Sequence, residues 1–140
     1  MNQLGELGKT EQFSTKDPIE TCVLWLLESL EKPMSAAALR ASVARLPGPW
    51  TFEEAIEALE SFGFRCHERS LSLSDLLSTH KSSIFLSENA VVAAIQPKTE
   101  AHPAQLFVPT RSSRPSPLSA EALAMIYGGM VIEIEAQLRL

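Results

Sequence analysis

Residues 17–30 read DPIETCVLWLLESL, and this stretch decides the fold because it predicts the central helix of the domain. Asp17 suits the N-cap, Pro18 suits the first helical position, and Glu20 completes a capping box. The apolar side chains then recur at helical spacing, at Ile19, Cys22, Val23, Leu26, Leu27 and Leu30. The sequence therefore predicts a core helix that begins after Asp17 and ends near Lys32–Pro33.

Two further helices are predicted after this one. Ser35 caps a helix that runs to about Arg45. Thr51 and Glu54 form a capping box for the next helix, which Gly63 ends. The first half of the chain is therefore expected to be helical.

The second half of the chain has the alternation that is typical of strands. The predicted strands are Phe64–Ser70, Ser83–Leu86, Ala90–Ile95, Leu106–Val108 and Met130–Glu135, the last with one solvated face. Short helices are expected after Ser72 or Ser74 and after Ser119, and 110–117 is expected to be an exposed loop. Helices followed by strands predict an α+β fold, with the N-terminal helices packed on a mostly antiparallel β-sheet.

Length and composition favour one globular domain without a nucleic-acid partner. The chain has 140 residues, 45% of them hydrophobic, and a formal net charge of -5, which leaves no basic footprint for nucleic acid. Residues 1–16 are polar and predict a flexible lead-in, 17–136 form the domain, and 137–140 start a linker. The longest apolar run, Cys22–Leu27, is too short to span a bilayer, so we expect a cytosolic segment without direct membrane insertion.

A family resemblance enters at the start of the first helix. The order Gln12, four residues, Asp17, Pro18, Ile19, two residues, Cys22 resembles the start of the peptidase domain of bacteriocin-exporting ABC transporters. The closing segment LSAEAL and the YGG that follows it are similar to the end of that domain. The resemblance covers 12–136 and implies a papain-like cysteine peptidase fold.

The chain departs from this family at the catalytic positions. The resemblance places Pro18 where the nucleophilic cysteine belongs, Asn89 at the histidine and His102 at the aspartate, because His102 precedes a Pro-Ala pair. Gln12 is either the oxyanion donor or a residue of the polar tail. Cys22 matches the second, structural cysteine and falls on the apolar stripe, where thiols are inert. We therefore expect no peptidase activity.

The closer resemblance is to degenerate versions of this domain. The segments DPIETCVLWLLE, KPMSAAALRA, AIEALESFGF and SLSDLL resemble domains that open the inner-membrane ABC transporters of type I secretion systems. Those transporters export RTX toxins and adhesins. The resemblance implies a non-catalytic domain at the cytoplasmic face of the bacterial inner membrane. Its partners would be the unfolded secreted polypeptide and the membrane and ATPase domains of the same transporter.

Five residues are candidates for contact with such a polypeptide. They are Trp25, Trp50, Phe52, Asn89 and His102. Trp25 lies off the main apolar stripe, so it either packs against the second helix or is an exposed anchor for a partner. Trp50 and Phe52 have the same two interpretations, and His102 either lines the old cleft or lies in an exposed loop.

No metal or cofactor site is predicted. Cys66 and His67 are adjacent in a predicted strand and point to opposite faces, and no phosphate-binding loop motif occurs. Three alternatives to substrate binding remain. The domain is a regulatory module that contacts the transporter's own nucleotide-binding or membrane domains, an active double-glycine leader peptidase, or an unrelated α+β domain.

Overall fold

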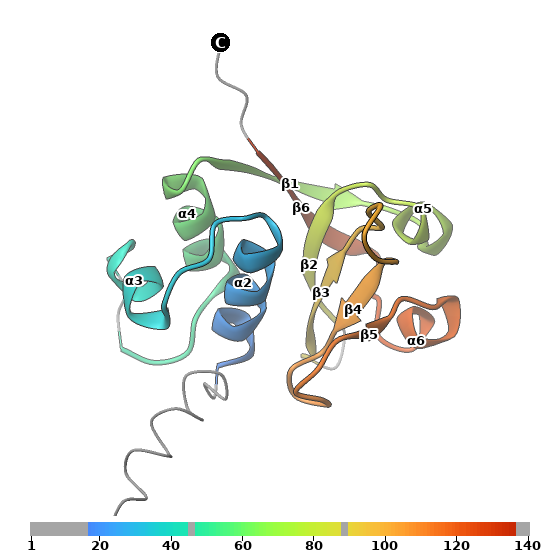
Figure 1. Cartoon of the computed structure of the whole chain (residues 1–140). Coiled ribbons are helices and arrows are strands. Elements are labelled where there is room, and N and C mark those ends of the chain that lie inside the picture. The colour runs from blue at the N-terminus through green and yellow to red at the C-terminus, as the bar shows by residue number, and fades with distance from the viewer. Residues whose placement is uncertain (1–16, 45–46, 88–89, 137–140) are drawn as a thin grey trace, which may run out of the picture.

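The computed structural model describes residues 17–44, 47–87 and 90–136, where six strands form one sheet between two groups of helices (Figure 1). The helices are α2 (Pro18–Ser29), α3 (Ala36–Ala41), α4 (Phe52–Ser61), α5 (Leu73–Leu77) and α6 (Ala120–Ala124). The strands are β1 (Phe64–Ser70), β2 (Ser82–Leu86), β3 (Val92–Gln96), β4 (Gln105–Phe107), β5 (Ser116–Pro117) and β6 (Met130–Ala136). The predicted α+β class and antiparallel sheet are confirmed.

The helix α2 begins where the sequence predicts and ends three residues earlier than Lys32. Asp17 is its N-cap and Pro18 its first residue. It stops at Ser29 because Glu31 adopts a left-handed backbone with φ of 64°. The amide of Lys32 then donates to the Leu27 carbonyl oxygen at 2.8 Å, which satisfies one of the last carbonyls of the helix.

The second helix is shorter than predicted. The Ser35 hydroxyl caps α3 as expected and accepts from the Ala38 amide at 3.1 Å. The helix ends at Ala41, where the Ser42 hydroxyl donates to the Leu39 carbonyl oxygen at 2.6 Å. Serine side chains compete with the backbone for such carbonyls. The predicted end near Arg45 is therefore wrong for α3, and Arg45 itself lies outside the described residues.

The capping box of α4 is confirmed. Thr51 Oγ1 accepts from the Glu54 amide at 3.1 Å, and Glu54 Oε1 accepts from the Thr51 amide at 3.0 Å. Gly63, with φ of 97°, turns the chain from α4 into β1, a conformation that side chains other than glycine rarely adopt. The cap and the glycine together fix both ends of α4.

The strands lie in the order β1-β6-β2-β3-β4-β5, and each pairs with its neighbour in the antiparallel sense. The strands β2, β3 and β4 are within two residues of their predicted bounds. The strand β5 lies inside the stretch that was predicted to be an exposed loop, and Pro117 pairs with Gln105 there. A proline is acceptable in β5 because β5 is an edge strand.

The two faces of the sheet carry separate apolar cores. In Figure 1, α2, α3 and α4 cover one face, and α5 and α6 lie on the other. On the first face the α2 and α4 side chains pack with Ile84, Val92 and Ile132. On the second face Leu76 and Leu123 pack with strand residues of opposite parity, which are Phe85, Ala93, Ile95, Leu106 and Val131. The alternation of strand side chains produces both cores.

The strand β6 lies inside the sheet, between β1 and β2, and its predicted solvated face is largely absent. Glu133 is only 6% exposed. Its carboxylate lies 3.5 Å from the Arg69 guanidinium and 3.9 Å from the Lys81 ammonium. The long side chains of the neighbouring segments cover this face, because Lys and Arg pack their aliphatic stems over sheet surfaces.

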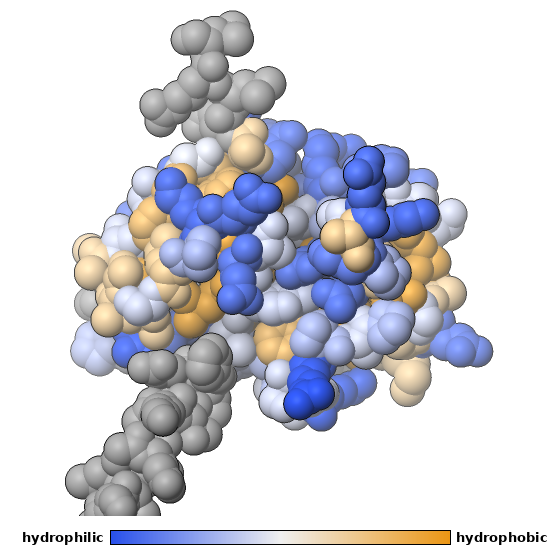
Figure 2. Space-filling view, viewed as in Figure 1, coloured by the Kyte–Doolittle hydropathy of each residue, from blue (hydrophilic) through white to orange (hydrophobic). Residues whose placement is uncertain are grey.

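None of the helices within 17–44, 47–87 and 90–136 is long and apolar enough to cross a bilayer. The predicted lead-in 1–16 and linker 137–140, together with Gln12 and Asn89, lie outside the described residues. Figure 2 shows mixed hydrophilic and apolar side chains on the face seen in Figure 1, with an apolar area over α2 and α3.

Candidate functional site

The first turn of α2 is where the resemblance places the catalytic nucleophile. Asp17 Oδ1 accepts hydrogen bonds from the amides of Ile19 and Glu20, each at 3.0 Å. Pro18 has no N–H of its own, so the first amides of the helix are bound by the Asp17 carboxylate. The Thr21 hydroxyl donates to the Asp17 carbonyl oxygen at 2.8 Å. This turn is a fully capped helix start.

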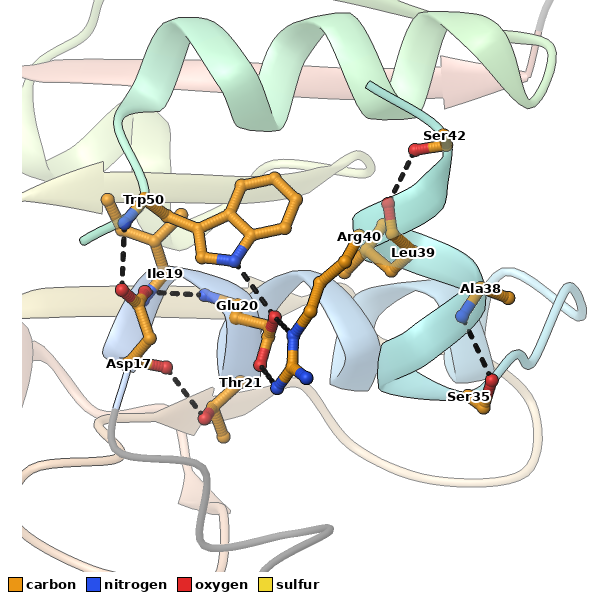
Figure 3. A network of polar contacts seen from close by, with 10 residues as sticks. All are labelled: Asp17, Ile19, Glu20, Thr21, Ser35, Ala38, Leu39, Arg40, Ser42 and Trp50. Atoms are coloured by element: carbon orange, nitrogen blue, oxygen red, sulfur yellow. Dashed lines mark hydrogen bonds and ion pairs between the residues drawn. The ribbon is translucent and has the colours of Figure 1, made fainter. Parts of the chain in front are cut away.

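A network of hydrogen bonds around the buried Glu20 carboxylate joins the start of α2 to α3 and to the segment before α4 (Figure 3). We call Asp17, Glu20, Arg40 and Trp50 the Glu20 network. Asp17 Oδ2 accepts from the Trp50 amide at 2.8 Å. Glu20 Oε2 accepts from Arg40 Nε at 2.6 Å and from Trp50 Nε1 at 2.9 Å, and Oε1 accepts from Arg40 Nη2 at 2.8 Å.

The Glu20 network holds α2, α3 and the segment before α4 together. Glu20 is 1% exposed, whereas the Arg40 side chain is 52% exposed and closes the network from the solvent side. A bidentate guanidinium is well suited to a buried carboxylate, because it satisfies both oxygens in one geometry. The sequence predicted only a local capping role for Glu20, and it did not predict the contacts of its carboxylate with Arg40 and Trp50.

The two cysteines are protonated thiols near neutral pH. Cys22 is completely buried one turn after Pro18, and burial, with a smaller contribution from the Asp17 carboxylate, raises its pKa. Burial and then the nearby Glu60 carboxylate raise the pKa of Cys66 to about 12. A thiol attacks only as the thiolate, so neither environment supplies a nucleophile.

The structure places His102 away from Pro18. His102 lies in the connection from β3 to β4, which begins at the paired residues Gln96 and Gln105. In Figure 1 this connection is at the opposite end of the sheet from the start of α2. Its Nδ1 lies 3.1 Å from the Pro103 carbonyl oxygen.

The chain leaves β4 through Val108 and Pro109, and in Figure 1 the connection after β4 lies at the end of the sheet where α2 begins. The resemblance was drawn instead at the pair His102–Pro103, which lies in the connection after β3. The structure thus brings the connection after β4, rather than the connection after β3 that contains His102, to the end of the sheet where α2 begins.

The three aromatic candidates have different environments. The Trp25 ring packs against Phe107 of β4, with centroids 5.1 Å apart and planes at 51°, and Trp25 is partly buried against the main core. Trp50 is 5% exposed and donates to Glu20, which excludes it as an exposed anchor. Phe52 is half-buried at the start of α4.

Phe52 lines a small open pocket on the face of the sheet that α2, α3 and α4 cover. We call it the helix-side pocket. Its lining residues are Phe52, Glu68, Ile84, Phe85, Leu86, Met130, Val131 and Ile132, and its volume is about 160 Å³. Leu86 and Met130 are 47% and 48% exposed. Neither residue was predicted from the sequence, although each lies two positions from a core residue, Ile84 or Ile132, and so points to the same face of the sheet.

No group of three or more His, Cys, Asp or Glu side chains within the described part of the chain is arranged to hold a metal ion. His67 Nε2 instead lies 3.5 Å from Glu135 Oε2. We assign no cofactor to the site.

Comparison with solved structures identifies the fold. The chain is similar to the N-terminal peptidase C39 like domain of the toxin secretion ATP-binding protein from Vibrio parahaemolyticus. The TM-score is 0.68 at 17% identity, over 86% of this chain and 98% of that one. It is also similar to the peptidase domain of Streptococcus ComA, a bifunctional ABC transporter of a quorum-sensing pathway. There the TM-score is 0.65 at 15% identity, over 88% of this chain and 93% of that one.

A third similar structure is a double glycine motif protease from an AMS/PCAT transporter in complex with its leader peptide. The TM-score is 0.67 at 9% identity, over 86% of this chain and 85% of that one. No family model matches the sequence, and no curated protein is significantly similar to it. At these identities the likeness establishes the fold alone, which is the papain-like fold of these peptidase domains.

Proposed function

We propose that this chain is a non-catalytic peptidase-like domain of a type I secretion ABC transporter, which binds or positions an unfolded RTX-type polypeptide before export. The observation that carries the proposal is the first turn of α2. Pro18 stands there with neither thiol nor N–H, and the next two amides already bind the Asp17 carboxylate. A cysteine peptidase needs a thiolate at this helix start and free donors for the oxyanion.

The remaining positions support the loss of catalysis. Asn89 stands in the sequence where the resemblance expects histidine, and asparagine cannot act as a general base. The connection after β4 lies at the end of the sheet where α2 begins, and it starts with Val108 and Pro109, whose side chains cannot orient an imidazole. Cys22 is one turn away but completely buried, with a raised pKa. The domain still has a capped α2 helix that packs on the sheet, and such a fold can bind a polypeptide without cutting it.

The transporter context comes from the structural neighbours. One is the N-terminal domain of a toxin secretion ATP-binding protein, and another was solved with a leader peptide bound. By analogy, our domain acts on a polypeptide beside a transporter, at the cytoplasmic face of the inner membrane. The fold alone does not imply this activity, so the proposal needs a direct test.

The test is an NMR titration of the isotope-labelled chain with a complete RTX polypeptide kept unfolded by EDTA. We expect residue-specific shifts with weak affinity, because an unfolded segment must be ordered on binding. The intact mass of the recovered polypeptide should be unchanged. The same RTX polypeptide folded with calcium is the control and should bind less. A spectrum without shifts at millimolar polypeptide would contradict the proposal.

A further inference from the structure

The helix-side pocket is an uncovered part of the sheet face that carries the main core. The pairing register sets Glu68 of β1 opposite Ile132 of β6, and Ile132 opposite Ile84 of β2. These three side chains therefore lie in one row on the same face. The helix α4 covers this face only as far as Phe52, its first residue, so the row ends in an open pocket.

The exposed apolar side chains gather at this pocket. Among the described residues, the large hydrophobic side chains that stay exposed are Leu86, Met130 and Met125. Two of the three, Leu86 and Met130, line the pocket, whereas Met125 is the C-cap residue of α6 and is 75% exposed. Leu86 and Met130 are about half exposed, and Ile84 and Ile132 beneath them are buried. A further apolar side chain that binds between Leu86 and Met130 would remove their exposed apolar surface from water, which is favourable.

The rim of the pocket is acidic. Glu68 lines the pocket and is exposed, and within the described residues no hydrogen bond or ion pair to its carboxylate is found. The cations of the same strand, Arg65 and Arg69, point to the other face of the sheet, where Arg69 meets Glu133. The chain as a whole carries a formal charge of -5. A cationic neighbour of the buried side chain would therefore be attracted to this rim.

We propose that the helix-side pocket recognises a segment of polypeptide in which one large apolar side chain is flanked by Lys or Arg. A cavity of roughly 150 Å³ holds a benzene-sized ring, so the volume here, about 160 Å³, takes one Phe or Leu side chain. The proposal deepens the proposed function. It rests on that function only for the origin of the segment, which would be a part of the exported polypeptide outside its acidic repeats.

The test follows the methyl signals of Met130 and Met125 in the labelled chain during titration with blocked heptapeptides. The probes are GSKFKSG, GSEFESG and GSKAKSG. The peptide GSKFKSG should shift Met130 and leave Met125 unchanged. The acidic peptide should bind at least fivefold more weakly because two lysines are replaced, and the alanine peptide should bind about tenfold more weakly or not at all.

Matched variants separate the pocket from general charge and general hydrophobicity. Leu86→Ser should weaken GSKFKSG binding about tenfold, and Met125→Ser, the control on α6, should not change it. Glu68→Lys should weaken it about two- to fivefold, whereas Glu121→Lys makes the same change in net charge away from the pocket and should have less effect. Each variant is compared with the parent by circular dichroism to confirm that it folds.

Several outcomes would overturn the pocket proposal. Shifts of Met130 without preference between the lysine and glutamate peptides would contradict the acidic rim. Peptide binding that appears only after deletion of residues 1–16 would assign the pocket to the chain's own N-terminal segment. Met130 shifts that follow protein concentration without peptide would assign it to a second copy.

The unfolded RTX polypeptide separates failure of the pocket from failure of the proposed function. If that polypeptide shifts other signals but not Met130, the pocket proposal is wrong and the function stands. If it shifts nothing, while GSKFKSG still shifts Met130, the function is wrong and the pocket stands.

Discussion

Pro18 brings neither a thiol nor an amide N–H to the start of α2, where the family resemblance places the nucleophile of a papain-like peptidase. The neighbouring Asp17 carboxylate accepts hydrogen bonds from the amides of Ile19 and Glu20. A negative charge at a helix N-terminus is stabilising, so this turn is arranged for helix stability. Replacing Pro18 with Cys would still leave the thiol beside the Asp17 carboxylate.

The first prediction concerns Arg40, which closes the Glu20 network from the solvent side. We expect Arg40→Ala to lower the free energy of unfolding by about 2 kcal/mol, because Glu20 then stays buried without its cation. Urea unfolding followed by tryptophan fluorescence measures the change. Arg111→Ala, at an exposed arginine in the loop after β4, is the control and should change stability by less than about 0.5 kcal/mol. Equal effects would contradict a structural role for the network.

The second prediction concerns alkaline pH. Folding raises the pKa of Cys22 and Cys66, the latter to about 12, so the folded chain keeps protons that the unfolded chain releases above about pH 8.5. Stability should therefore fall as pH rises between pH 8 and pH 10, by about 2 kcal/mol for the fully buried Cys22 and by less for the partly exposed Cys66.

The measurement is urea unfolding at several pH values. Cys66→Ala should reduce the alkaline slope. A stability that is constant between pH 8 and pH 10 would show that the thiols ionise equally in both states and would contradict the burial.

Single residues also show where sequence reasoning stops. The Asp17 cap, the Pro18 position and the buried Cys22 follow from local patterns, and the structure contains all three. Trp50 and Arg40 meet Glu20 across 30 and 20 residues of chain, so no local pattern reports these contacts. His102 was assigned from a Pro-Ala pair, although its place depends on the connection between two strands.

The first residues of the helices were predicted more accurately than their last residues. Ser35, Thr51 and Ser119 cap the helices that follow them, as predicted, and of the two candidates Ser72 and Ser74 it is Ser72 that caps α5. The ends of α2 and α3 depend on a left-handed Glu31 and a competing Ser42 hydroxyl, which are conformations rather than residue types. The pairing of β5 and the interior place of β6 depend on distant strands.

The third prediction concerns the cap of α4, which forms one wall of the helix-side pocket. Thr51→Ala removes the acceptor for the Glu54 amide and should cost about 1 kcal/mol of stability. Thermal unfolding measured by circular dichroism reports the loss. Ser74→Ala, inside α5, removes a hydroxyl that caps no helix, and is expected to change stability little. A loss no larger for Thr51→Ala than for Ser74→Ala would refute the cap's contribution.

The fourth prediction concerns the whole molecule and its order of local stability. The strand β6 pairs on both sides and carries core residues on both faces, so the amides of Ile132 and Ile134 should exchange slowest. The two-residue β5 and the helix α3, in which only Leu39 is buried, should exchange fastest. Hydrogen exchange measured residue by residue checks this order. Protection of α3 equal to that of β6 would contradict it.

At the scale of the molecule, the α+β class and the peptidase-like fold were predictable, because helix periodicity and strand alternation are local and the motifs keep their order along the chain. The candidate site was predictable only in its first turn. Leu86 and Met130 meet because β2 and β6 are neighbours in the sheet, and that neighbourhood is a property of the tertiary structure.

The most direct test of the central claim, that this peptidase fold has no nucleophile at the start of α2, is the intact mass of a double-glycine leader peptide after incubation with the chain. We predict an unchanged mass under reducing conditions across neutral pH, for the parent chain and for Cys22→Ala alike. Cleavage after the two glycines by the parent chain, lost in Cys22→Ala, would contradict the claim.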